Sequence, residues 1–283
     1  MIFKTISEIK DYIPTTMVDI QYLTMHETRA MLKHLPKYLG VDLTKQLMVE
    51  EPSANNLLLI ESLKGAIANL AYLEAVPFID LVSTKTGFGI VSNQNMAPAS
   101  AQRVENFKDA CLKAADDYLS DALLFLELNS ANYPTWNKSS LIDGGLMASI
   151  DEWPAEININ YSRVKFVNLV PYIKQAERLY VTKKLSPEFV AVIADTDDMD
   201  VLPDARKALA FYAVYLKGND ELKDDSLGLK HLNEKNIETA NEYLNSCIDF
   251  LNTHLETYPV YQEFGYSTAF QNDLSTFGFI KLG

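Results

Sequence analysis

The chain has 283 residues, of which 48% are hydrophobic, and a formal net charge of −13 at pH 7. This length can bury a core without a disulfide or metal, and the negative charge disfavours nucleic acid and anionic membranes as main ligands. The sequence contains no apolar run of about 18 residues, as a membrane-spanning helix would need, and its first residues lack the pattern of a signal peptide. We therefore expect a soluble intracellular protein.

Helix signals begin near the N-terminus. The sequences Thr5–Glu8 and Thr24–Glu27 are capping boxes, which predict two helix starts. Pro14 and Pro36 predict the corresponding ends, because the residue before a proline avoids the helical conformation. A short helix over residues 42–48 is expected to follow.

Two long helices are predicted in the rest of the first half. Apolar residues recur at three- and four-residue steps from about residue 52 to 77, and again from about 99 to 128. Between them, residues 83–100 break the pattern with glycine and asparagine, which predicts a loop or a hairpin arm. Residues 129–145 read as a connector.

The second half repeats this helical pattern. Ser162 is a predicted N-cap, and Ser186 is another, with Pro187 at the first helical position. A helix over residues 204–217 is expected to end at Gly218, and the last long helix is expected over residues 234–255.

The two halves resemble each other in sequence, and the matching segments occur in the same order. We therefore predict an all-α protein made of two tandem, similar helical bundles, an internal duplication, although helical sequences also share generic apolar patterns. The predicted parts are residues 1–140, residues 141–257 and an aromatic tail over residues 258–283. The matches are Tyr118–Leu126 with Tyr243–Leu251, Lys64–Leu73 with Lys207–Leu216, Met31–Pro36 with Phe166–Pro171, and Tyr12–Pro14 with Glu152–Pro154.

The sequence offers no recognisable catalytic, cofactor or metal site. Cys111 and Cys247 lie in helical patterns and read as small core residues. The acidic run Asp195–Asp200 lacks the glycine and glutamate of a calcium loop and reads as the cap of the following helix. The histidines lack metal-binding spacing and read as surface or cap residues. They are His26, His34, His231 and His254.

The last 26 residues, 258–283, are rich in aromatic residues and poor in charge, unlike a typical disordered tail. Two alternatives remain open from the sequence. The tail packs on its own bundle, or it is an arm that docks on another subunit, where aromatic anchors dominate interface energetics.

One segment resembles a known family. Gly87–Ser100, followed by Arg103 and a long helix ending in Leu126–Glu127, is similar to uncharacterised helical virion proteins of Bacteroidetes phages, including crAss-like phages, and prophages. The helical duplication is also similar to head–tail connector (adaptor) proteins. The resemblance implies a phage structural protein in the virion, made in the host bacterial cytoplasm. It further implies a homo-oligomeric ring, a dodecamer, that contacts the portal and other head–tail connector or tail proteins.

The resemblance carries over no catalytic residue, so we expect a structural role without enzymatic activity, cofactor, membrane or sequence-specific nucleic-acid binding. The alternatives are a cytosolic helical-repeat binding or regulatory module and an enzyme with an unrecognised site. Under the leading hypothesis, the segment 85–100 and the tail are the contact elements. The predicted partner-interface residues are Phe88, Ile90, Val91, Met96, Tyr258, Tyr261, Phe264, Tyr266, Phe270, Phe277 and Phe279.

Overall fold

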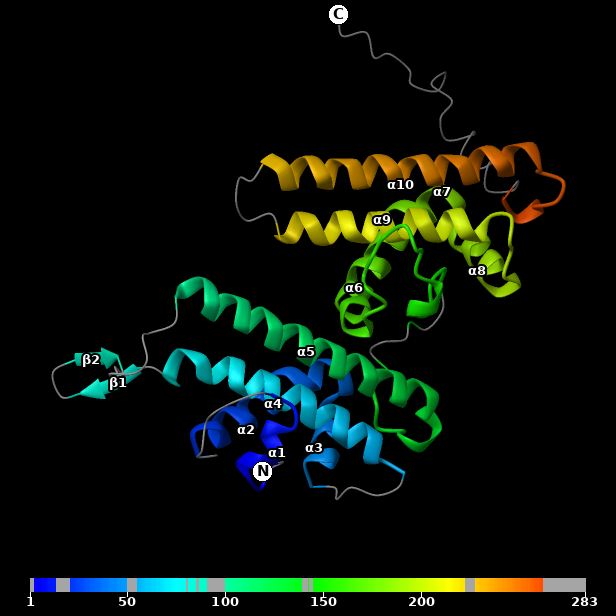
Figure 1. Ribbon diagram of the computed structural model, residues 1–283. Coiled ribbons are helices and arrows are strands. Elements are labelled where there is room, and N and C mark those ends of the chain that lie inside the picture. The colour runs from blue at the N-terminus through cyan, green and yellow to red at the C-terminus, as the bar shows by residue number, and fades with distance from the viewer. Residues whose placement is uncertain are drawn as a thin grey trace, which may run out of the picture. The chain divides into compact units, whose positions relative to one another are not determined.

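The computed structural model describes residues 3–13, 21–49, 55–79, 81–84, 87–90, 100–138, 142, 145–221 and 227–261. Within these residues the fold is all-α apart from one two-stranded hairpin, which confirms the predicted class. It divides into two compact units, one of residues 1–140 with 162–167, and one of residues 141–161 with 168–283. Each unit contains a pair of long antiparallel helices (Figure 1).

The first unit is built around a central buried helix. Its elements are α1 (Ile6–Lys10), α2 (Gln21–Leu39), α3 (Val41–Val49), α4 (Leu57–Ile79), β1 (Leu81–Thr84), β2 (Gly87–Ile90), α5 (Ala101–Leu128) and the 3-10 turn η1 (Ser130–Asn132). Helix α4 is apolar around most of its circumference, as expected for a helix covered on several sides. Small buried side chains, Ala30 of α2, Ala71 of α4 and Ala115 of α5, let the three helices approach closely.

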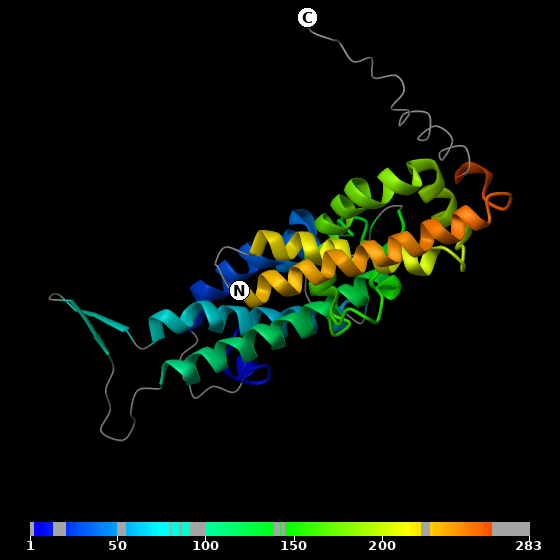
Figure 2. The ribbon, with the colours of Figure 1, turned by 90° about the horizontal axis from the view of Figure 1, so that it is seen from above.

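The second unit contains the other long pair. Its elements are η2 (Ile150–Glu152), most of α6 (Arg163–Ala176), the π-helical turn η3 (Glu177–Val181), α7 (Thr182–Leu185), α8 (Pro187–Thr196), α9 (Leu202–Glu221) and α10 (Leu227–Thr253). Figure 2 shows α9 and α10 running side by side. Tyr212 of α9 stacks on Tyr180 with ring centroids 4.3 Å apart, and its hydroxyl donates to Asn241 of α10 at 2.7 Å.

Several predicted helix starts are confirmed by local hydrogen bonds. The Thr5 side chain accepts from the Glu8 amide, the Ser162 side chain from the Lys165 amide, and the Ser186 side chain from the Phe189 amide. Each of these side chains satisfies an amide that the first helical turn leaves without a partner.

Three predicted helix signals are wrong. Thr24 lies inside α2, not at its start, and α2 continues through Pro36 to Leu39. The actual stop is Gly40, whose φ of +83° favours glycine and whose amide donates to the Pro36 carbonyl. Gly218 does not close α9, which continues to Glu221. A Cβ at Gly218 would lie 2.4 Å from Oδ1 of Asn233, so this glycine permits the close approach of α10.

The long helix pairs share a burial pattern that bears on the predicted duplication. Four positions of α5 and the four matching positions of α10 are all at most 3% exposed. The shared pattern is consistent with duplication, but it also follows from ordinary helix pairing, so the duplication stays a prediction. The matching pairs are Ala115 with Ala240, Leu119 with Leu244, Ala122 with Cys247 and Leu126 with Leu251.

Candidate functional site

The hairpin between α4 and α5 contains two of the predicted interface residues. Strands β1 and β2 pair antiparallel, so that Phe88 lies opposite Ser83 and Ile90 opposite Leu81. Figure 1 shows the hairpin extending from the end of the α4–α5 pair. Val91 and Met96, the other two predicted residues of this segment, lie outside the described residues.

The helix end next to the hairpin carries exposed apolar side chains. Phe78 is 61% exposed and Ile79 is 40% exposed, at the end of α4, and one residue separates them from β1. The Phe78 ring stacks on His26, with centroids 5.4 Å apart. His26 is only 6% exposed, so the prediction of a surface histidine is wrong there, and its Nδ1 has no hydrogen-bond partner among the described residues. Phe78 and Ile79 together are called the hairpin base below.

The first two tail aromatics lie in the core of the second unit. Tyr258 and Tyr261 are 8% and 6% exposed, and both rings contact Phe189 of α8, at centroid distances of 5.8 and 5.3 Å. Burial, together with a hydrogen bond to Asp198, raises the pKa of Tyr258 to about 12. These two tyrosines therefore pack on their own chain and are not available as interface residues. The other predicted tail residues lie outside the described residues: Phe264, Tyr266, Phe270, Phe277 and Phe279.

A charged cluster joins α2 to α4. The carboxylate of Glu74 contacts Arg29 Nε at 3.0 Å, Lys33 Nζ at 2.7 Å and His34 Nε2 at 3.3 Å. Burial acts to raise the pKa of Glu74, but the hydrogen bonds from Lys33 and His34 and the nearby positive charges outweigh it, so the pKa is lowered. One carboxylate thus neutralises only part of the positive charge on this face of α2.

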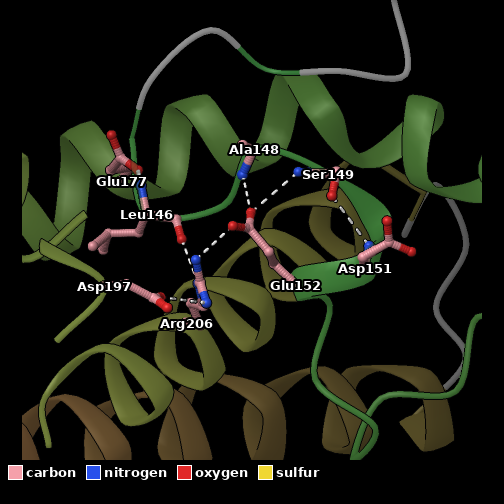
Figure 3. A network of polar contacts seen from close by, with 8 residues as sticks. All are labelled: Leu146, Ala148, Ser149, Asp151, Glu152, Glu177, Asp197 and Arg206. Atoms are coloured by element: carbon pink, nitrogen blue, oxygen red, sulfur yellow. Dashed lines mark hydrogen bonds and ion pairs between the residues drawn. The ribbon is translucent and has the colours of Figure 1, made fainter. Parts of the chain in front are cut away.

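A polar network in the second unit holds the segment before η2 (Figure 3). Arg206 of α9 donates from Nε to the Leu146 carbonyl at 2.7 Å and from a terminal nitrogen to Glu152 at 2.6 Å. The other oxygen of Glu152 accepts from the amides of Ala148 and Ser149. Because Arg206 and Glu152 bind each other and also backbone groups of residues 146, 148 and 149, the network reads as structural.

The same segment also depends on a half-buried acid of the π-helical turn. The Leu146 amide donates to Glu177 at 2.9 Å. Burial raises the pKa of Glu177 above its ordinary value of 4.5, although the bond from Leu146 acts in the opposite direction. The π-helical geometry often marks functional positions, but here the acid has a backbone partner and so a structural use.

The raised pKa of Glu177 predicts a pH-dependent stability. The folded state holds this proton more tightly than the unfolded state, so the contribution to stability is full below pH 4.5 and is lost as the pH rises through the folded-state pKa. The change Glu177→Gln is therefore expected to raise the melting temperature at pH 8 and to leave it unchanged near pH 4. Thermal unfolding at both pH values measures the change in melting temperature. Glu188→Gln, at an exposed position of α8, is the control, and an equal effect of both changes would contradict the prediction.

The metal-ligating and nucleophilic side chains of the described residues are dispersed. Among the described residues, no three of His, Cys, Asp and Glu are grouped so that they could hold a metal ion. Cys111 and Cys247 are buried and free, as expected for core residues, and burial raises the pKa of Cys247 to about 12. Asp198 accepts from the amides of Asp200 and Val201 in the turn that leads into α9, so its carboxylate has a structural use, while the capping interpretation of the acidic run stays a prediction. None of the described helices is long and apolar enough to cross a membrane.

The fold and these surfaces define an all-α protein with two long helix pairs and a hairpin inserted into one of them. Residues 34–143 and 213–271 match the model of a family of unknown function, DUF6712, and the chain belongs to that family. The matched residues include the hairpin and the start of the tail. No curated protein and no solved structure matches the chain.

Proposed function

We propose that the chain is a structural protein of a tailed-phage virion, a head–tail connector (adaptor) ring subunit that contacts the portal and neighbouring tail proteins. It would be made in the host bacterial cytoplasm and assembled into the virion. The observation that carries the proposal is the resemblance of residues 87–100 to phage virion proteins. The segment begins at β2, in the part of the chain that projects from the helices (Figure 1).

A comparison of the two long helix pairs supports a binding role for the hairpin. Helices α9 and α10 are joined by residues 222–226 alone, whereas α4 and α5 are joined by residues 80–100, which include both strands. A pair of long antiparallel helices therefore does not need the longer connection in order to form. Residues that the fold does not need are candidates for contacts with a partner.

The exposed hairpin base supports the same role. Phe78 and Ile79 hold large apolar side chains in solvent at the point where the chain enters β1. Covering such side chains in a complex gains roughly 25 cal/mol per Å² of apolar surface removed from water. A partner that binds the hairpin would also cover the hairpin base.

The proposal predicts a separation between folding and assembly. Replacing residues 81–99 by a connection as short as residues 222–226 is expected to keep the helical circular dichroism and the melting temperature close to those of the intact chain. The same change is expected to abolish the complex with the cognate portal protein, measured by light scattering of the mixture. The change Phe78→Ser with Ile79→Ser is expected to weaken that complex at least tenfold.

A matched change in the second unit is the control for this experiment. Shortening the α9–α10 connection, residues 222–226, should leave the portal complex intact. A chain without the hairpin that still joins the portal at full affinity would contradict the proposal. If the protein is a monomer that does not bind the portal but binds a soluble partner one to one, the alternative is favoured, a helical-repeat binding or regulatory module.

A further inference from the structure

The outward face of α2 is basic and apolar, unlike the chain as a whole. Its exposed side chains include Met25 at 74%, Arg29 at 63%, Leu32 at 56% and Lys33 at 57%. Residues 25, 29 and 32 follow helical spacing and so lie along one side of the helix. The acid of α2, Glu27, is 2% exposed and lies on the opposite, buried side. Arg29 and Lys33 share one carboxylate, that of Glu74 on α4, so these three residues keep a net positive charge. We call Met25, Arg29, Leu32 and Lys33 the α2 face.

The charges of the chain are unevenly divided between the two units. The first unit has 14 Lys and Arg residues against 16 Asp and Glu residues, and the second has 11 against 22. Most of the net charge of −13 therefore belongs to the second unit. A basic face on the first unit is attracted to the second unit of another copy.

The second unit has an exposed segment whose character complements the α2 face. Between α8 and α9, the side chain of Asp197 is 73% exposed, Met199 is 74% exposed and Asp200 is exposed. Asp195, in the last turn of α8, is exposed too. Arg206 lies 3.9 Å from Asp197, so one of these acids has a partner already. The segment 195–200 thus combines acids with an apolar side chain, as the α2 face combines bases with apolar side chains.

We infer that the α2 face of one copy docks on segment 195–200 of a second copy. The two surfaces differ, so the contact is heterologous, and every copy keeps one surface of each kind for the next neighbour. Such contacts add one copy after another, and the assembly either closes into a ring or grows as a filament. The inference deepens the proposed function, and it rests on that function only for closure as a ring.

Charge reversal on each surface tests the contact. The α2 variant is Arg29→Glu with Leu32→Glu, which keeps the bond from Lys33 to Glu74. The loop variant is Asp195→Lys with Asp200→Lys. Sedimentation velocity in about 50 mM salt should show concentration-dependent association of the unaltered chain, weakened in about 1 M salt, where the screening length is roughly 3 Å. Each variant alone should associate at least tenfold more weakly.

Mixing the variants gives the decisive result. The α2 variant has an acidic α2 face, which complements the basic loop of the loop variant, so an equimolar mixture should associate again. A chain with all four changes has an acidic α2 face and a basic loop, so it should associate with itself. The control is Leu112→Glu with Lys113→Glu on α5, which alters the net charge as the α2 variant does and should have no effect. Circular dichroism confirms that each variant is folded.

Several results would overturn this inference. They are an unaltered chain that stays monomeric at every concentration, a control as damaging as the α2 variant, a mixture that does not associate, or association that requires an added polyanion. Binding of the portal by the hairpin is measured separately. A chain that binds the portal but does not associate with itself would therefore reject the α2 contact and leave the portal-binding part of the proposed function standing.

Discussion

A chain that ends at Thr257 is expected to be less stable than a chain that ends at Tyr261, by about 4 kcal/mol in the free energy of unfolding. The difference comes from two buried aromatic side chains, Tyr258 and Tyr261, which both contact Phe189. Burying one large side chain contributes about 2 kcal/mol. Urea unfolding of the two truncated chains, followed by circular dichroism, measures the difference.

The two truncations also separate folding from assembly. The chain ending at Tyr261 keeps both core tyrosines but lacks residues 262–283, so under the proposed function it should fold and fail to join the virion complex. Tyr258→Phe keeps the ring but removes the hydroxyl bonded to Asp198, and it should cost only about 1 kcal/mol. Equal stability of the two truncated chains would show that the tyrosines contribute little to the core.

Removing the Arg163 side chain is expected to lower the free energy of unfolding by about 3 kcal/mol or more, because a buried acid would lose its ion-pair partner. Arg163 Nε lies 2.7 Å from Glu127 Oε2, and the two side chains are only 8% and 13% exposed. The second oxygen of Glu127 is buried and has no hydrogen-bond partner among the described residues. The change Arg163→Met would therefore leave a carboxylate with little water and no cation to offset its charge.

A double substitution separates the lost pair from lost packing. The chain with both Arg163→Met and Glu127→Met buries no charge at this place, so it should recover much of the stability that Arg163→Met loses. Glu127→Gln, which keeps an acceptor for the guanidinium, should be milder than Arg163→Met. Urea unfolding of the three variants gives the free energies. A double variant less stable than Arg163→Met would mean that the side-chain stems matter more than the charges.

Helix starts were predictable where the signal is local. Ser162 and Ser186 cap helices through bonds to amides three residues ahead, and the residues in between are visible in the sequence. Thr24 shows the same pattern but lies inside α2. Capping chemistry permits a helix start but does not require one, because burial of the flanking residues can extend the helix past it.

The candidate interaction site was predicted only in part. Glycine and asparagine, which interrupt the helical period between residues 83 and 100, predicted a loop or a hairpin arm there, and the structure has a hairpin with strands Leu81–Thr84 and Gly87–Ile90. The α2 face was missed, because its character depends on which side of the helix is covered by α4. A count of acids and bases along α2 includes Glu27, and only the fold shows that this acid points away from solvent.

The sequence by itself determined that the protein is helical, where its long helices lie and that its segment 83–100 leaves the helical pattern. These properties follow from periodicity and turn chemistry over a few neighbouring residues. Only the tertiary structure decided which charges are paired and which aromatics are core. Glu74 and Arg29, or Glu127 and Arg163, are far apart in the chain, and their contacts form only when the helices pack. Tyr258 and Tyr261 look like the rest of an aromatic tail until α8 supplies the surface that buries them.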